Sequence, residues 1–268
     1  MRDEDGVALQ QVSASAANSG HTTGRIELDD TVCPTGPDHY RIEHDGQGFT
    51  CEAKPVVIRA CANSDCSDVY AEPASITLAP TGWVGGDNFS FNGSANASLN
   101  NPSEGNITLS QVGSSPTAPL RCFSGNTETC ELAFVNDGFE FIGATADDKI
   151  LKDQVAELNF SEVNLRAVRS NAGVCEVLLA GDKDINLSYD CLSPGSCLRP
   201  LGAIPVSNAA GVNSASVSLA FSPQGIASLS PLVYADAGRL TLGAEAVIEG
   251  VTITSGPVSY THLTLPTN

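Results

Sequence analysis

The chain has 268 residues, of which 41% are hydrophobic and 16% charged, and 31 acidic against 13 basic side chains give it a net charge of −18. This length suits one large or two medium domains. So acidic a surface repels phosphate backbones and anionic lipid, which argues against nucleic-acid and membrane-surface binding. We expect no membrane insertion in these residues either, since no apolar run reaches about 18 residues.

The first 36 residues are polar and rich in small side chains, with one strand-like piece, GRIELDD, at residues 24–30. They are typical of the end of a preceding domain followed by a linker. The opening MRDEDGVALQQVS lacks the basic and apolar pattern of an export signal. We therefore expect the 268-residue chain to be a fragment of a longer exported precursor.

Residues 37–143 show short runs in which apolar and polar residues alternate, separated by turn residues. The alternating apolar pairs are Tyr40 and Ile42, Val56 and Ile58, Ile76 and Leu78, Phe89 and Phe91, Ile107 and Leu109, Leu132 and Phe134, and Phe139 and Phe141. A period of two over short runs indicates half-buried antiparallel strands. In the turn Asn136-Asp137-Gly138, the glycine is expected to supply the positive φ that a tight strand entry often needs.

An acidic connector, ATADDKILKDQVAEL at residues 144–158, is the only candidate helix, because Asp147 or Asp148 could cap one or two turns. Strand patterning then resumes up to residue 256. The alternating pairs there are Leu158 and Phe160, Val163 and Leu165, Ile185 and Leu187, Val217 and Leu219, Leu240 and Leu242, and Val251 and Ile253. The stretch YADAGRLTL at 234–242 resembles the Asp-x-Gly turn that opens a late strand of immunoglobulin-like domains.

These patterns predict an all-β fold class: two tandem immunoglobulin-like β-sandwich modules, stapled by disulfides, that follow the end of an upstream domain. The expected ranges are 1–36 for the upstream end and linker, 37–143 for the first module and 144–256 for the second. A single elongated sandwich is the alternative. Residues 257–268 resemble translated cloning or adaptor sequence and are expected to be a non-native tail, unless they form a genuine linker strand.

Nine cysteines are too many for a reducing compartment unless they bind metal or do redox chemistry. No CxxC occurs, and the four histidines are not clustered with cysteines at zinc spacing, so no metal site is predicted. His39 and His44 lie five residues apart, which would point them to opposite faces of one strand and leave both solvated. Disulfides therefore place the chain in the periplasm, on the cell surface or outside the cell.

Four disulfide pairs follow from spacing. Cys175 and Cys191 would face each other across a hairpin that turns at Gly181–Asp184, Cys122 and Cys130 flank the segment SGNTE, Cys61 and Cys66 close the loop ANSD, and Cys33 and Cys51 are left to pair. Cys197 has no assigned partner in this scheme. It could compete with Cys175 for Cys191 or have a partner outside these residues.

The sequence contains no catalytic signature: G-x-S-x-G, GxxxxGK[ST], GxGxxG and HExxH are all missing. The chain is therefore predicted not to be an enzyme and to need no cofactor. Calcium is the one ion that turn aspartates could hold, at Asp137, Asp182, Asp184 and Asp236, but no Asp-x-Asp-x-Asp-Gly run supports it, and the alternative is plain turn-forming aspartates.

Trp83, in PTGWVGGD, is the only tryptophan. Its indole could stack on a sugar, with the adjacent glycines giving the ligand access, or it could cap the core where the chain crosses between sheets. The core interpretation is the favoured one, and Trp83 remains the candidate ligand contact.

Several strings resemble the C-terminal portion of MshQ-like proteins, large bacterial envelope proteins associated with biogenesis of the mannose-sensitive haemagglutinin (MSHA) type IV pilus. They are DHYRIEHDGQGFTCEAKPVVIRACANSDC, TLAPTGWVGGD, RCFSGNTETCELAFVNDGFEF, LRAVRSNAGVC, INLSYDC and YADAGRLTLGA, and span about residues 37–245. GRIELDD resembles the closing strand of a lectin-like sandwich that can precede this region. The resemblance implies no catalytic motif.

The function predicted is that of a non-catalytic stalk or interaction platform of a bacterial surface or periplasmic protein of the MSHA pilus system. Its partners would be other domains of the same precursor, pilus or envelope proteins, and glycans in the binding alternative. That alternative is an adhesin-like module that uses the Trp83 region, and a cell-wall or glycan hydrolase ranks third.

Overall fold

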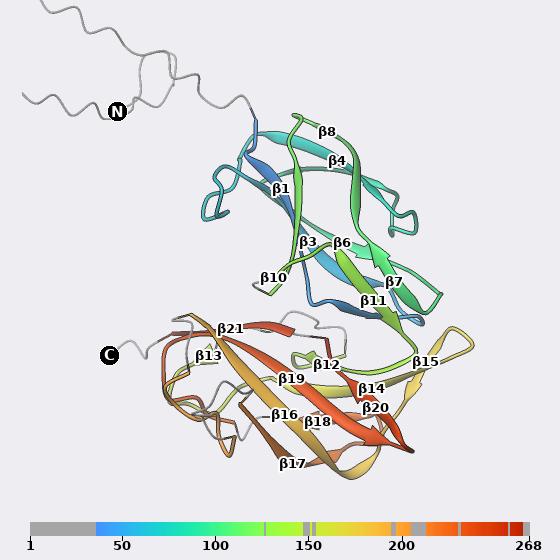
Figure 1. The fold of residues 1–268 in the computed structure, drawn as a ribbon, viewed down its shortest axis with the longest axis vertical. Helices are drawn as coiled ribbons and strands as arrows, with labels where there is room; N and C mark the ends of the chain where they lie inside the picture. Colours follow the sequence, from blue (N-terminus) through green and yellow to red (C-terminus); the bar gives the residue numbers. More distant parts are fainter. Residues whose placement is uncertain are drawn as a thin grey trace, which may run out of the picture. The chain divides into compact units, whose positions relative to one another are not determined.

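The computed structural model describes residues 36–125, 127–146, 151, 154–193, 197–204, 213–229, 232–256 and 258–264. All regular elements in these ranges are β-strands, β1 to β21 (Figure 1). The chain therefore has the all-β fold that the alternating patterns predicted. The strand-like piece at residues 24–30 and the residues Asp147 and Asp148 lie outside the described part.

The first sandwich is built from two facing sheets and a smaller third one. The larger sheet has the order β10-β9-β1-β3-β6, the facing sheet β5-β4-β8, and the small sheet β2-β11-β7. The strand bounds are β1 His39–His44, β2 Gln47–Phe49, β3 Lys54–Cys61, β4 Pro73–Ala79, β5 Asn88–Asn92, β6 Ser94–Leu99, β7 Gly105–Thr108, β8 Ser110–Ser115, β9 Leu120–Ser124, β10 Thr127–Glu128 and β11 Glu131–Val135.

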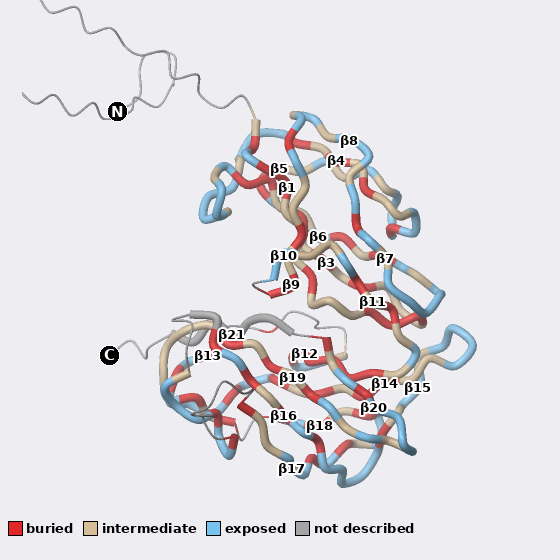
Figure 2. Tube along the Cα trace, in the orientation of Figure 1, coloured by how far each residue is buried: buried red, intermediate tan, exposed pale blue. Residues whose placement is uncertain are grey.

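One hydrophobic cluster fills this sandwich. It joins Tyr40 and Ile42 of β1 to Ile58 of β3 and to Ile76 and Leu78 of β4. The burial of β3 and β4 alternates residue by residue, because successive side chains of a strand point to opposite faces. Figure 2 shows these buried stretches running along the strands.

The second sandwich pairs a sheet of order β12-β14-β15, with β18 on β14, against a sheet of order β13-β21-β19-β16-β17, with β20 on β19. The strand bounds are β12 Asp137–Ile142, β13 Gln154–Val155, β14 Asn164–Asn171, β15 Val174–Val177, β16 Gly181–Ser193, β17 Asn213–Phe221, β18 Ile226–Ser228, β19 Gly238–Ile248, β20 Val251–Thr254 and β21 Val258–Thr264. A second hydrophobic cluster, which includes Phe141, Leu187 and Leu242, lies between its sheets.

The chain passes from the first hydrophobic cluster to the second between Phe134 and Phe139. Strand β12 pairs along its whole length with β14, from Asp137 opposite Arg169 to Ile142 opposite Asn164. Its Phe139 is buried in the second cluster, while Phe134 is buried in the first. The module ranges expected from sequence remain predictions, but the pairing of β12 with β14 favours a boundary between the two modules before residue 143.

Residues 258–264 of the expected tail form β21, which pairs with β19, and the non-native origin of the tail stays a prediction. Three local expectations were wrong. Val155 lies in strand β13 rather than in a helix. Leu158 is 57% exposed, since the chain turns there. Gly138 is not among the positive-φ residues, and its missing side chain matters instead for the close packing described below.

Candidate functional site

The structure contains four disulfides among its described residues, and two of them are the pairs expected from spacing. Cys61 bonds to Cys66 and Cys122 to Cys130. Each of these bridges closes a short segment, with the two cysteines 5 and 8 positions apart in sequence.

The other two pairings expected from sequence were wrong. Cys175 bonds to Cys51, and Cys191 bonds to Cys197. The predicted hairpin turn at Gly181–Asp184 does not form, because these residues open the 13-residue strand β16. Cys175 lies in β15, which pairs with β14 in the opposite sheet from Cys191. Cys33 lies outside the described residues.

The bridge between Cys51 and Cys175 joins the two sandwiches covalently. Cys51 follows β2 of the first sandwich and Cys175 lies in β15 of the second, 124 positions apart in sequence. Polar contacts surround it. The buried hydroxyl of Thr50 is hydrogen-bonded to Asn136 Oδ1 at 2.7 Å and to Ser170 Oγ at 2.8 Å. We call the contacts between residues 45–52 and the second sandwich the junction.

An ion-pair cluster lies in the same junction. Arg166 Nη1 is 3.1 Å from Glu52 Oε2 of the first sandwich and 2.5 Å from Glu140 Oε1 of its own. Burial lowers the pKa of the Arg166 guanidinium, but the charges of Glu140 and Glu52 outweigh burial and raise the pKa above its ordinary value. The partly buried cation thus has acidic partners from both sandwiches, as a desolvated charge requires.

Two glycines allow the backbones to approach closely here. A Cβ at Gly138 would lie 2.7 Å from Phe49 Cε1, and a Cβ at Gly256 would lie 2.5 Å from the carbonyl oxygen of Asp45. Gln47 Nε2 also donates a hydrogen bond to the Thr254 carbonyl at 3.3 Å. The junction is therefore packed as well as bonded.

Trp83, the candidate ligand contact, is 5% exposed and belongs to the first hydrophobic cluster. Its ring contacts Phe89 edge to face, with centroids 5.5 Å apart. The adjacent Val84, Gly85 and Gly86 are exposed. The indole therefore packs in the core, and no face of it is presented for stacking on a sugar.

The four candidate calcium ligands are not brought together into one described site. Asp137 forms an ion pair with Arg169, with Nη2 and Oδ2 3.2 Å apart. Asp182 and Asp184 lie exposed on β16 rather than in a turn. Asp236 accepts a hydrogen bond from the backbone of Ala237.

The two histidines of β1 are buried, so the expectation that both are solvated was wrong. His39 is 1% exposed and His44 is 5% exposed. Although no histidine lies at zinc spacing from a cysteine in the sequence, a ring nitrogen of His39 and the sulfurs of Cys61 and Cys66 all lie within 4.8 Å of one another in the fold. The antiparallel register that sets His39 opposite Cys61 across 22 positions of sequence leaves no spacing motif.

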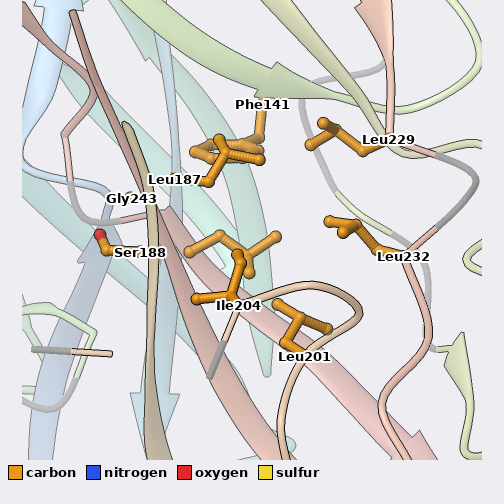
Figure 3. A pocket seen from close by; sticks show the side chains of 9 residues that line it. Phe141, Leu187, Ser188, Leu201, Ile204, Leu229, Leu232 and Gly243 are labelled. Atoms are coloured by element: carbon orange, nitrogen blue, oxygen red, sulfur yellow. The ribbon is translucent and has the colours of Figure 1, made fainter. Parts of the chain in front are cut away.

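Two hollows lined by described residues bear on function. One lies inside the second sandwich, where apolar side chains such as Leu201, Ile204 and Leu232 line a space that admits no water molecule (Figure 3). The other is an open pocket of about 340 Å³, lined by Arg41, Arg121, Phe123 and Arg239 together with Ser64, Asp65 and Gly125.

Arginine and aromatic side chains stack in this second hollow, which we call the arginine pocket. The guanidinium carbon of Arg41 lies 4.1 Å from the centre of the Phe123 ring, and that of Arg121 lies 5.2 Å from it. Arg121 also forms a two-point ion pair with Glu128, at 2.8 and 2.9 Å. Three of the chain's 13 basic side chains therefore line this pocket, where Arg41 pairs with Glu43 and Arg121 with Glu128.

The fold and disulfides define the chain as an extracytoplasmic-type, immunoglobulin-like β-sandwich protein, and a family comparison agrees on the immunoglobulin-like fold. Residues 119–256 match the family described as "Domain of unknown function (DUF6701), first Ig-like domain". This match covers 138 of the 268 residues, so the chain belongs to that family. Residues 38–117 match a second family, described as "Domain of unknown function (DUF8613)".

Solved structures with detectable likeness include intimin and invasin. The "D0-D1 domain of Intimin" is 12% identical with a TM-score of 0.30, over 84% of this chain and 97% of that one. Invasin, described as a bacterial integrin-binding protein, is 15% identical with a TM-score of 0.23, over 85% of this chain and 39% of that one. No curated protein matches the chain, and no described helix could span a membrane.

Proposed function

We propose that the chain is a non-catalytic structural and interaction module of an exported bacterial surface protein, in the biogenesis or display of an MSHA-type pilus. The observation that most favours a structural role is the Cys51–Cys175 bridge, which cross-links the two sandwiches in addition to the backbone that connects them. Four disulfides require an oxidising compartment, which fits the envelope or the cell exterior.

The junction supports rigidity beyond the covalent bond. Thr50, Glu52 and Gln47 each contact the second sandwich through hydrogen bonds or ion pairs. A linker that served only as a tether would need none of these contacts, since flexible linkers are polar and unpacked. A stalk, in contrast, gains from holding successive modules in one arrangement.

The test of the structural role is a paired replacement of cysteines. The double variant Cys51→Ser/Cys175→Ser should keep both sandwiches folded by far-UV circular dichroism but broaden the distance distribution between spin labels placed one in each sandwich. It should also lose stability, on the order of 4–5 kcal/mol in the chain-entropy estimate for a loop of about 100 residues.

The matched control is Cys122→Ser/Cys130→Ser, which removes a bridge inside the first sandwich and should leave the inter-sandwich distances unchanged. An unchanged distribution in the Cys51/Cys175 variant would contradict the rigid-stalk role.

The pilus assignment is tested separately. Replacing residues 37–256 of the encoded protein by a flexible linker should abolish surface pili, and normal piliation would contradict the assignment.

The arginine pocket favours a binding role as a second candidate, at a different place from Trp83. Guanidinium groups bind carboxylates through paired hydrogen bonds, so the fitting ligand is an acidic side chain or an acidic sugar. An Arg239→Ala variant should lose binding to an acidic-glycan array, while Arg199→Ala, an exposed arginine outside the pocket, should retain it. Absence of binding by the unmodified protein to acidic glycans and acidic peptides would remove this candidate.

A further inference from the structure

The neighbourhood of His39 contains an unexplained buried group. His39 begins β1 and faces Cys61, the last residue of β3, across an antiparallel pair. Directly opposed residues project their side chains on the same face of the sheet, a few ångströms apart. Cys66 reaches the same place because the chain turns back through residues 62–65, with Cys66 itself at φ 61°.

The His39 ring has one satisfied and one unsatisfied nitrogen. Nδ1 lies 2.8 Å from Asp38 Oδ1, so Nδ1 donates a hydrogen bond to the carboxylate. Nε2 is buried and has no hydrogen-bond partner among the described residues. Leaving a polar atom buried without a partner costs folding free energy, and such atoms are rare in native proteins. The Nε2 lone pair is therefore available for a ligand that the protein would hold by other groups as well.

Those other groups are the two sulfurs. A ring nitrogen of His39 and the Sγ atoms of Cys61 and Cys66 lie within 4.8 Å of one another. Zinc takes cysteine sulfur at about 2.3 Å and histidine nitrogen at about 2.0–2.1 Å, so tetrahedral ligands lie roughly 3.5–4 Å apart. Once the disulfide is reduced, the two sulfurs must move apart to this spacing and the ring nitrogen must come within it. The partly exposed Cys66 closes a short loop that can supply this movement.

The Asp38 carboxylate is placed as a supporting group for such a site. Metal-binding histidines usually donate their second ring N–H to a carboxylate or carbonyl, which fixes the ring orientation and strengthens the ligand. Asp38 and His39 already form this arrangement. His44, at the other end of β1, differs, because its Nε2 donates to the Thr129 carbonyl and its Nδ1 accepts from the Gly46 N–H.

We infer that reduction of the Cys61–Cys66 disulfide converts this cluster into a zinc site with His39 Nε2, Cys61 Sγ and Cys66 Sγ as ligands. Two equivalents of a thiol reductant give two electrons and two protons to the disulfide and leave as their own disulfide. Zn²⁺ then displaces the two thiol protons, and the fourth position is open to water or to a partner's side chain. The redox state thus selects between a covalent staple and a metal site, which goes beyond the proposed structural role.

The test is an anaerobic titration of the phosphine-reduced full chain with Co²⁺, followed by displacement with Zn²⁺. We expect one tight site with sulfur-to-cobalt charge-transfer absorption and tetrahedral ligand-field bands, and no such site in the oxidised protein. Cys61→Ser/Cys66→Ser should abolish the site, and His39→Asn should weaken binding at least tenfold. The matched controls Cys122→Ser/Cys130→Ser and His44→Asn should both retain it.

The inference would be overturned if His39→Asn and His44→Asn bound Co²⁺ with equal affinity. A cobalt site that survives in Cys61→Ser/Cys66→Ser would also overturn it. Loss of the β-sheet circular dichroism signal on reduction of the unmodified protein would also overturn it, because the site needs the pairing of β1 with β3. If His39→Asn fails to fold when oxidised, Asp38→Asn takes its place, with an expected loss in affinity of about tenfold or more from the missing supporting carboxylate. Unchanged affinity in that variant would count against the site.

Discussion

His44 is the buried residue whose protonation the fold opposes most directly. Burial lowers its pKa below the ordinary 6.5, and the nearby Lys54 charge acts in the same direction, while the hydrogen bond to Thr129 and the charge of Asp45 act against it. The neutral ring fits its contacts, since Nδ1 accepts a hydrogen bond from Gly46 and a protonated ring could not. The folded state therefore holds His44 neutral.

This predicts a loss of stability in mild acid that depends on His44. The unfolded chain binds the proton near pH 6.5 and the folded chain only at a lower pH, so stability is fully present above about pH 6.5 and falls as the pH drops toward the folded-state pKa. Denaturant titrations between pH 7.5 and 5 should show this fall in the unmodified protein. The slope should be shallower in His44→Gln, whatever its absolute stability, and equal slopes would contradict the assignment.

For single residues, burial was predictable where it depends on neighbours along the chain. It was not predictable where it depends on a residue that the fold brings close from elsewhere in the sequence. The alternation around Tyr40 and Ile42 correctly indicated a half-buried strand, because the period of two is a property of the strand itself. The burial of His39 depends on Cys61, and the burial of Trp83 depends on Phe89. No local pattern reports either partner.

Among the elements, the junction shows most clearly what strand patterning cannot reveal. Strand β12 was recognisable as an extended segment from Phe139 and Phe141, whereas β2 was not among the expected strands. In neither case does the sequence pattern say which backbones touch. Gly256 lies against Asp45, 211 positions away, with room for no Cβ. The same limit explains the wrong pairing of Cys175: its strand was expected in a hairpin with the next one, whereas β15 pairs with the preceding strand β14.

The close approach at the junction predicts the effect of adding one methyl group. Gly256→Ala would place a Cβ 2.5 Å from the Asp45 carbonyl oxygen, a backbone atom that cannot move aside cheaply. We expect a loss of about 1–3 kcal/mol in the free energy of unfolding, as for other overpacked sites. The control is Gly113→Ala in β8, where a Cβ meets nothing within 4 Å. Chemical denaturation that ranks the two variants equally would rule out tight packing here.

For the molecule as a whole, the excess of acidic groups opposes compaction. A net charge of −18 generates self-repulsion that the expanded unfolded chain partly relieves. Salt screens this repulsion, with the Debye length falling from about 30 Å at 0.01 M to about 10 Å at 0.1 M ionic strength. Ion pairs such as Arg166–Glu52 are weakened by the same screening, but they are few beside the unbalanced acids.

The melting temperature should therefore rise between 0.01 and 0.1 M NaCl. Each kcal/mol of relieved repulsion corresponds to a shift of about 2–4 °C in a chain of this size class. Differential scanning calorimetry in NaCl and in KCl separates screening from specific ion binding, because screening gives the same rise in both. A fall in melting temperature with added salt would mean that the ion pairs outweigh the general repulsion.

The overall architecture was more predictable than the connections within it. Composition, strand spacing and cysteine number together indicated an all-β, disulfide-stapled chain of immunoglobulin-like type, which the family match over residues 119–256 supports. These are averages over many residues, so a single misjudgement such as that of Leu158 does not change them. The cross-link between Cys51 and Cys175 is one specific contact, and only the folded topology reveals it.

That cross-link also determines how the chain would respond to mechanical pulling. Tension applied from residues before Cys51 to residues after Cys175 passes through the sulfur–sulfur bond and bypasses the intervening backbone. Strands β3 to β14 then lie off the load path, and they cannot lengthen the molecule even if they unravel. In a thin surface fibre exposed to flow, such a shunt limits extension while leaving most of the first sandwich unloaded.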